Sequence, residues 1–120
     1  MSRHAIILLG HGSRDPLWRR PIEAVAERLT RRNADVAVCC AYLELEPPDL
    51  ATAAARLAAG GAQRVTIVPM FLGTGKHGRD DPPRLLELLR QTHPAVEFDL
   101  RPPVGDDPRV LDLLAVIAAE

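Results

Sequence analysis

Residues 4–16 read HAIILLGHGSRDP, and this stretch decides the fold. Five consecutive apolar residues follow the first histidine, which is typical of a β-strand buried on both faces of a parallel sheet. Gly10, His11 and Gly12 end the apolar run, and Asp15 and Pro16 then resemble the capped first turn of a helix. The stretch therefore predicts a buried strand that leads through a short loop into a helix.

The same alternation of strand and helix continues to the end of the chain. The first predicted strand covers residues 4–9. Hydrophobic runs predict three more strands, over residues 35–43, 64–71 and 95–100. Helical spacing and capping residues predict helices between and after the strands, over residues 16–32, 49–60 and 81–93 and from 107 onward. Four strand–helix units without a linker predict one α/β domain over residues 1–120. We expect a flavodoxin-like, three-layer domain with a four-stranded parallel sheet, strand order 2-1-3-4, and helices on both faces.

Composition excludes several classes of function. The net charge of −1 and the 3% of aromatic residues disfavour nucleic-acid binding and attraction to an anionic membrane. No apolar stretch reaches the roughly 18 residues that a transmembrane helix needs, and the first apolar run is too short for a signal peptide. Cys39 and Cys40 are adjacent, which is unsuited to a redox motif, so we expect buried thiols and a cytoplasmic location.

The candidate site follows from where the polar residues fall. Ligands of open α/β sheets bind beyond the carboxyl ends of the strands, and His11, Glu44 and His77 follow the first, second and third predicted strands. With strand order 2-1-3, the ends of these strands lie within roughly 10 Å of one another. Two imidazoles and a carboxylate suit divalent zinc, iron, cobalt or nickel. The sequence thus indicates a metal site at this rim.

Other interpretations of the same loops stay open. The glycines around the two histidines could admit a large ligand or could simply make tight turns. GHGSRDP and GTGKHG lack the spacing of nucleotide-binding loops, although a phosphate at a helix N-terminus is a weaker alternative. Three cationic side chains are also expected on the rim: Arg14, Lys76 and Arg79. They could bind an anionic ligand, or they could pair with the neighbouring aspartates Asp15, Asp80 and Asp81.

Three residues outside the rim receive structural interpretations. His4 begins a strand and His93 ends a helix, both at the opposite edge of the predicted sheet, so neither is expected in the site. Trp18 is interpreted as a core residue, or as an interface anchor if its helix is exposed on assembly.

Three stretches resemble a known family. LLGHGSRDP (8–16), AYLELEPPDL (41–50) and VPMFLGTGKHGRDDPP (68–83) are similar to the motifs of the small CbiX-type sirohydrochlorin chelatases, which are class II chelatases. The resemblance extends through PPVGDDPRVLDLL (102–114) and so covers nearly the whole chain. It implies a lyase that inserts divalent cobalt or iron, or nickel in some relatives, into a sirohydrochlorin-type tetrapyrrole in cobalamin or sirohaem biosynthesis.

The resemblance also implies roles for residues. His11 and His77 would handle the metal and the protons, and Glu44 would supply the carboxylate. The substrate would contact residues on the two rim loops: Ser13, Arg14, Gly75, Lys76 and Arg79. The metal leaves with the product, so no permanently bound cofactor is expected. Chains of this length are expected to form homodimers with a cleft between the subunits. Two departures, Trp18-Arg19 and Pro82, affect the expected substrate contacts more than the metal site.

Two rival functions use the same fold. A non-catalytic carrier of metal or tetrapyrrole would share the site but would not turn over, because fold alone does not determine function. A receiver-like signalling domain would need an acidic cluster after the first strand, where this chain has His11.

Overall fold

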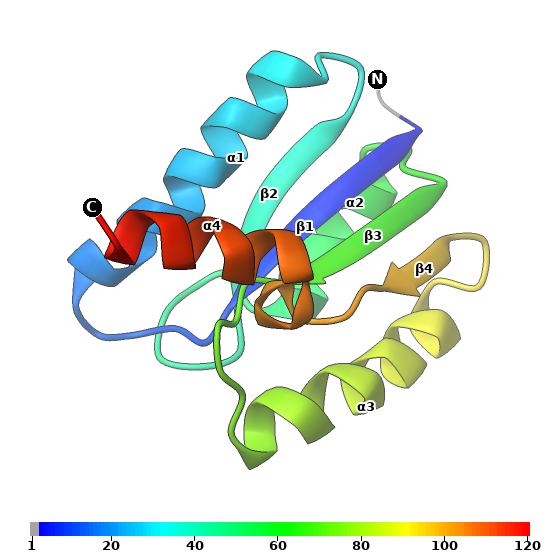
Figure 1. Cartoon of the computed structure of the whole chain (residues 1–120). Helices are drawn as coiled ribbons and strands as arrows, with labels where there is room; N and C mark the ends of the chain where they lie inside the picture. Colours follow the sequence, from blue (N-terminus) through cyan, green and yellow to red (C-terminus); the bar gives the residue numbers. More distant parts are fainter. Residues whose placement is uncertain (1–2) are drawn as a thin grey trace.

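A parallel four-stranded sheet forms the centre of the structure (Figure 1). The computed structural model describes residues 3–120. The strands lie in the order β2-β1-β3-β4, which confirms the predicted order and direction. They are β1 (His4–Gly10), β2 (Ala37–Tyr42), β3 (Arg64–Pro69) and β4 (Glu97–Leu100).

Helices cover both faces of this sheet, as expected. They are η1 (Pro16–Arg19), α1 (Arg20–Arg32), α2 (Leu50–Ala59), α3 (Lys76–Thr92), η2 (Val104–Asp106) and α4 (Pro108–Ala118). On one face, Ile22 of α1 packs with Leu8 and Tyr42. On the other, α2 and α3 pack on the odd-numbered residues of β1, and this second cluster is the main core. The alternation along β1 therefore divides its apolar side chains between two layers.

Strand register brings the three predicted site loops to one edge. In the pairing of β1, Gly10 lies opposite Tyr42 of β2, and Leu9 lies opposite Pro69 of β3. The three strands therefore end at the same level. Hydrogen bonds continue past the strands, because the amide of Leu43 donates to the carbonyl of Gly10 at 3.0 Å. The loops that follow β1, β2 and β3 thus begin side by side.

The predicted helix over residues 16–32 is divided in two. Asp15 caps the 3₁₀ turn η1 by accepting a hydrogen bond from the amide of Leu17 at 3.0 Å, as expected from the Asp-Pro pair. The α-helix begins only at Arg20, with Pro21 in its first turn. Proline has no N–H to donate to the carbonyl of Leu17, so the α-helical hydrogen-bond series cannot run through this point.

The predicted start of α3 was wrong. Asp81-Pro82-Pro83 suggested a helix beginning there, but α3 begins at Lys76, and both prolines lie inside the helix. The amide of Arg79 already donates to the carbonyl of Gly75 at 3.2 Å. Gly78 and Pro82 are buried, so packing against the body stabilises the upstream turn despite the lost proline hydrogen bonds. His77 is therefore in the first turn of a helix and not in a loop.

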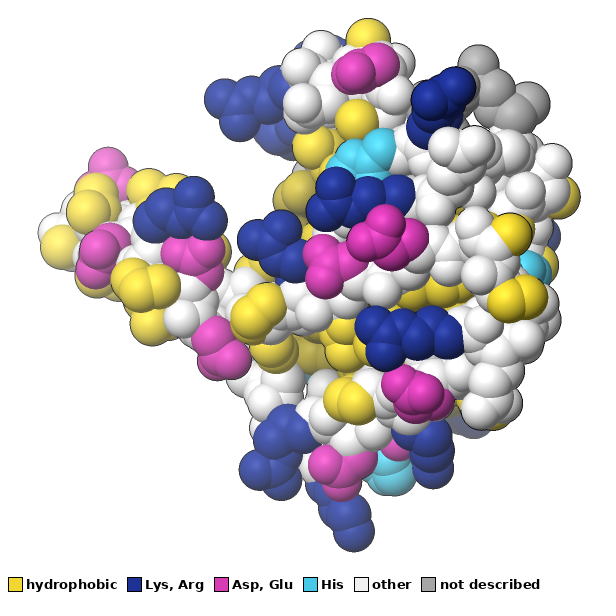
Figure 2. All heavy atoms as spheres, turned by 90° about the vertical axis from the view of Figure 1, so that its right-hand side faces the viewer, with side chains coloured by type: hydrophobic (Ala, Val, Ile, Leu, Met, Phe, Trp, Pro, Cys, Tyr) yellow, Lys and Arg dark blue, Asp and Glu magenta, His cyan; other side chains and the backbone are white. Residues whose placement is uncertain are grey.

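The last helix, α4, stands away from the rest of the domain. Asp107 caps it, as predicted, by accepting a hydrogen bond from the amide of Arg109 at 2.9 Å. None of its residues is buried. The radius of gyration of 14.5 Å exceeds the about 13.6 Å of a compact domain of this size. The projecting helix accounts for this elongated shape (Figure 2).

Neither cysteine forms a disulfide. Cys39 and Cys40 lie in β2 and are half-buried. Burial, with the neighbouring thiol, raises the pKa of Cys39 to about 11, which keeps this thiol protonated and unreactive. Among the helices of residues 3–120, none has both the length and the apolar character that crossing a membrane requires.

Candidate functional site

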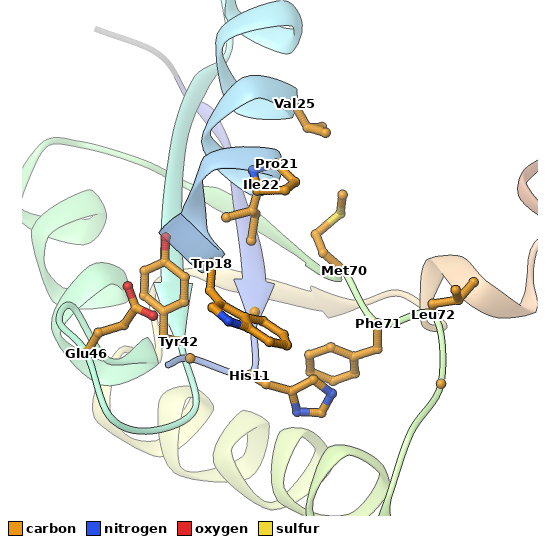
Figure 3. Close-up of a pocket in the computed structure, with 13 residues that line it drawn as sticks. His11, Trp18, Pro21, Ile22, Val25, Tyr42, Glu46, Met70, Phe71 and Leu72 are labelled. Carbon is orange, nitrogen blue, oxygen red and sulfur yellow. The ribbon is translucent and has the colours of Figure 1, made fainter. Parts of the chain in front are cut away.

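A cavity of about 400 Å³ opens at the carboxyl ends of β1, β2 and β3 (Figure 3). Its walls are mainly apolar and aromatic, from Trp18, Tyr42, Met70 and Phe71, and His11 lies at its edge. This is the crevice beyond the strand ends where open α/β sheets bind ligands. The cavity therefore lies at the rim where the sequence placed the candidate site.

The imidazole of His11 is held by packing. It stacks on the ring of Phe71, with ring centroids 4.0 Å apart and planes inclined by 21°. On another side it meets the first turn of α3, where a methyl group on Gly78 would lie 3.0 Å from its Cε1. Phe71 is only 1% exposed and so provides a fixed surface. Within residues 3–120 no hydrogen bond to this ring is present, so packing orients it and its nitrogens remain available to a ligand.

The second predicted histidine lies on the same side of the domain but faces solvent. The side chain of His77 is 88% exposed, and its Nδ1 is 3.4 Å from Oδ2 of Asp81, one helical turn later. Gly78, the next residue, contacts the ring of His11, so both histidines border the junction between the β1 loop and α3. The pairing with Asp81 leaves Nε2 of His77 free. A carboxylate on one nitrogen is a common way to orient a metal-binding imidazole.

The two glutamates after β2 have different surroundings. Glu44 is exposed and lines a depression on the α2 side with Thr52 and Arg56, although its amide donates to the carbonyl of His11 at 3.1 Å. Glu46, with a side chain only 6% exposed, lines the His11 cavity. Its Oε2 accepts a hydrogen bond from the amide of Ser13 at 2.7 Å. Glu46 therefore anchors the β1 loop, and Glu44 has the free carboxylate.

The structure does not gather the expected metal ligands within one chain. Among residues 3–120, no three His, Cys, Asp or Glu side chains lie close enough to hold a metal ion together. His11 and the turn that carries His77 are in contact, whereas the carboxylate of Glu44 lies outside the His11 cavity.

The other predicted contact residues lie at the same edge. Ser13 follows His11, and Gly75 is the N-cap of α3. Arg14, Lys76 and Arg79 are exposed. None of the ion pairs of residues 3–120 includes these three cations, whereas Asp81 pairs with His77 and Arg84, and Asp15 caps η1. The cations are therefore free to meet an anionic ligand.

Several residues of the cavity were not identified from the sequence. The sequence placed Phe71 at the end of a predicted strand and not in the site. It favoured Glu44 over Glu46 as the carboxylate of the site. Trp18, interpreted first as a core residue, is 73% exposed at the mouth of the cavity, so the core interpretation was wrong. Burial raises the pKa of Tyr42 to about 12, which keeps its hydroxyl protonated. Two glutamates follow β2, Glu44 and Glu46, so the sequence presents both as possible site carboxylates. Only tertiary contacts distinguish the two.

Comparison with protein families and curated proteins gives consistent matches. The CbiX family model matches residues 5–120. The sirohydrochlorin cobaltochelatase of Methanocaldococcus jannaschii is 30% identical, over 92% of this chain and 94% of its own. The sirohydrochlorin cobaltochelatase of Saccharolobus solfataricus is 31% identical, over 91% of this chain and 88% of its own.

Solved structures with the same fold include further chelatases. A CbiX protein assigned to cobalamin (vitamin B12) biosynthesis in Marinobacter aquaeolei VT8 matches with a TM-score of 0.79 and 38% identity, over 97% of this chain and 95% of its own. The sirohydrochlorin chelatase SirB of Bacillus subtilis in complex with cobalt matches with a TM-score of 0.78 and 26% identity. That match covers 93% of this chain but only 47% of SirB.

Proposed function

Since this chain belongs to the CbiX family, we propose that it inserts a divalent metal ion, cobalt or iron, into sirohydrochlorin. Nickel remains a further candidate, because histidine and carboxylate ligands accept all three metals. The observation that carries the proposal is the placement of His11. Its ring stacks on Phe71 at the edge of an apolar and aromatic cavity, and it meets the helical turn that carries the second histidine.

The chemistry of the reaction matches these groups. Metal insertion must remove water from the ion and two protons from pyrrole nitrogens. A neutral imidazole can bind a divalent metal through a ring nitrogen or accept a proton there. We assign these tasks to His11 and His77, which border the same junction.

The cavity walls and the cations would position the substrate. A flat macrocycle can pack on apolar and aromatic side chains, while its carboxylates meet Arg14, Lys76 and Arg79. Ser13 and Gly75 lie on the same two loops and would approach the ring edge. Holding the ring against the metal converts a bimolecular encounter into an oriented reaction. The metal is a substrate, so the proposed reaction needs no permanently bound cofactor.

We also propose that the active form is a cytoplasmic homodimer. The free thiols of Cys39 and Cys40 are compatible with a reducing compartment. The exposure of His77 and the absence of a three-ligand cluster in residues 3–120 support a site that is completed by a second subunit.

A turnover assay distinguishes this function from that of a carrier. With sirohydrochlorin and Co²⁺ in large excess over protein, we expect many equivalents of metallated product, followed by absorbance, and saturation with rising substrate. Parallel assays with Fe²⁺ and Ni²⁺ would rank the metals. Formation of no more than one equivalent per chain, above the rate without protein, would support the carrier instead.

Glu44 and Glu46 are expected to respond differently to substitution by glutamine. Glu44→Gln should lower the metallation rate by about 100-fold, as expected for a lost proton acceptor or ligand, with an unchanged free energy of unfolding. Glu46→Gln should instead lower that free energy by about 1–2 kcal/mol, because a charge-assisted hydrogen bond to Ser13 is weakened. Urea unfolding and initial rates measure both effects. A normal rate in Glu44→Gln would remove Glu44 from the site.

A further inference from the structure

Glu46 is a buried carboxylate that has no part in the reaction proposed above. Its side chain is only 6% exposed, and it lines the His11 cavity from the side of β2 (Figure 3). Both of its oxygens have partners. Oε2 accepts the hydrogen bond from the amide of Ser13 at 2.7 Å, and Oε1 lies 3.4 Å from Nη1 of Arg19. A carboxylate is buried at low cost only when it is paired and hydrogen-bonded, so these two partners account for its burial.

The two partners belong to the two ends of one segment. Ser13 lies in the loop that carries His11, and Arg19 is the last residue of η1, which carries Trp18. In Figure 3 the indole of Trp18 extends from η1 over the cavity, toward His11. One carboxylate is therefore bonded both to the loop that holds the histidine and to the turn that holds the tryptophan.

Hydrogen bonds close this segment into a ring. The amide of Asp15 donates to Oγ of Ser13 at 3.1 Å, and Oδ1 of Asp15 accepts from the amide of Leu17 at 3.0 Å. Arg19, at the end of the same turn, then pairs with Glu46. We call these five residues the Glu46 ring. Glu46 is its single member from another part of the chain, 33 positions from Ser13 and 27 from Arg19, so the ring opens without it.

The position of η1 depends on this ring because packing contributes little to it. None of the residues of η1 is buried, and Trp18 is 73% exposed. Its helical hydrogen bonds are those of a short 3₁₀ turn, whose geometry is weaker than that of an α-helix. The ion pair of Arg19 with the buried Glu46 therefore fixes the turn, and the indole with it, against β2.

The same carboxylate fixes the backbone of the loop around His11. On one side, the amide of Glu44 donates to the carbonyl of His11 at 3.1 Å. The bond from Ser13 to Glu46 holds the backbone two residues later. The stacking of the imidazole on Phe71, with ring centroids 4.0 Å apart, requires the loop to stay in this place.

We propose that Glu46 is a positioning residue of the metal-insertion site, which fixes the His11 ring and the Trp18 indole relative to one another across the cavity. It acts through Ser13 and Arg19 and does not contact the reacting atoms, because both of its oxygens are occupied. This inference rests on the function proposed above. A displacement of about 1 Å in a reacting group can lower a rate by about 100-fold, so a carboxylate that acts only through its neighbours has a measurable effect.

Glu23 provides a matched control. Its Oε1 lies 3.5 Å from Nε of Arg19, so it pairs with the same guanidinium, but its side chain is 55% exposed and lies one turn along α1. Glu46→Gln offers one carbonyl oxygen to two donors and opens the ring, whereas Glu23→Gln leaves the ring closed. With saturating sirohydrochlorin and Co²⁺, we expect kcat to fall about 10-fold in Glu46→Gln and to be unchanged in Glu23→Gln. Circular dichroism at the assay temperature confirms that both variants are fully folded, so lost stability does not lower these rates.

Fluorescence of Trp18, the single tryptophan, tests the geometry without metal or tetrapyrrole. Time-resolved anisotropy measures the motion of the indole on the nanosecond timescale. We expect the amplitude of this motion to increase in Glu46→Gln and to match the unaltered protein in Glu23→Gln. Arg19→Met opens the ring at its other end and keeps Glu46, so it should increase the motion and lower kcat as well. It carries the test if Glu46→Gln does not fold.

Three results would overturn the positioning role. The first is a kcat of folded Glu46→Gln within twofold of that of the unaltered protein, which would leave the residue an anchor for stability only. The second is an unchanged motion of Trp18 in that variant. The third is an equal loss of kcat in Glu46→Gln and Glu23→Gln, which would trace the effect to the charge around Arg19. Failure of the proposed function is a different observation, because the unaltered protein would then form no metallated product.

Discussion

Replacing His77 by alanine is expected to abolish metallation while leaving the fold intact. The imidazole is 88% exposed, and its pairing with Asp81 at 3.4 Å contributes at most about 1 kcal/mol, so the free energy of unfolding should change little. Loss of a group that binds the metal or accepts a proton should lower the rate by about 100-fold or more. Initial rates of product formation from sirohydrochlorin and Co²⁺, with urea unfolding alongside, measure the two quantities.

His93 provides a matched control for His77. It lies at the C-terminal end of α3, at the opposite edge of the sheet, where its ring is near Phe98 with centroids 6.1 Å apart. His93→Ala removes the same chemical group from the wrong edge, so we expect a normal rate. Near-normal turnover by His77→Ala, or an equal loss in both variants, would contradict the assignment of His77.

The second large effect is expected at Gly12, in the loop that carries His11. Gly12 has a φ of +97°, and a Cβ atom there would lie 1.8 Å from the carbonyl oxygen of Glu44. Gly12→Ala must therefore move one loop away from the other. The backbone conformation costs about 1–2 kcal/mol and overpacking about 1–3 kcal/mol more. We expect the free energy of unfolding to fall by about 3 kcal/mol and activity to be lost with it.

Gly73 gives the comparison for this substitution. A Cβ atom on Gly73 would meet no atom within 4 Å, although this residue also borders the His11 cavity. Gly73→Ala should therefore keep the urea midpoint of the unaltered protein. If Gly12→Ala unfolds at the same urea concentration as Gly73→Ala, the close approach of the two loops in the structure is wrong.

Local pattern was sufficient for the architecture. The apolar runs that end in glycine, the Asp-Pro caps and the helical spacing predicted four strand–helix units, and the sheet has the expected order and direction. These features depend on residues close together in the chain, because backbone periodicity and capping are local properties. The same reasoning placed His11 and His77 at the same edge, since parallel strands end together.

Contacts between distant segments decided the rest. Burial of Gly78 and Pro82 extended α3 past two prolines, so His77 begins a helix. The stacking of His11 on Phe71 and the burial of Glu46 beneath the β1 loop involve residues 60 and 33 positions apart. Which side chains meet depends on packing in three dimensions, and a pattern of neighbouring residues does not specify it.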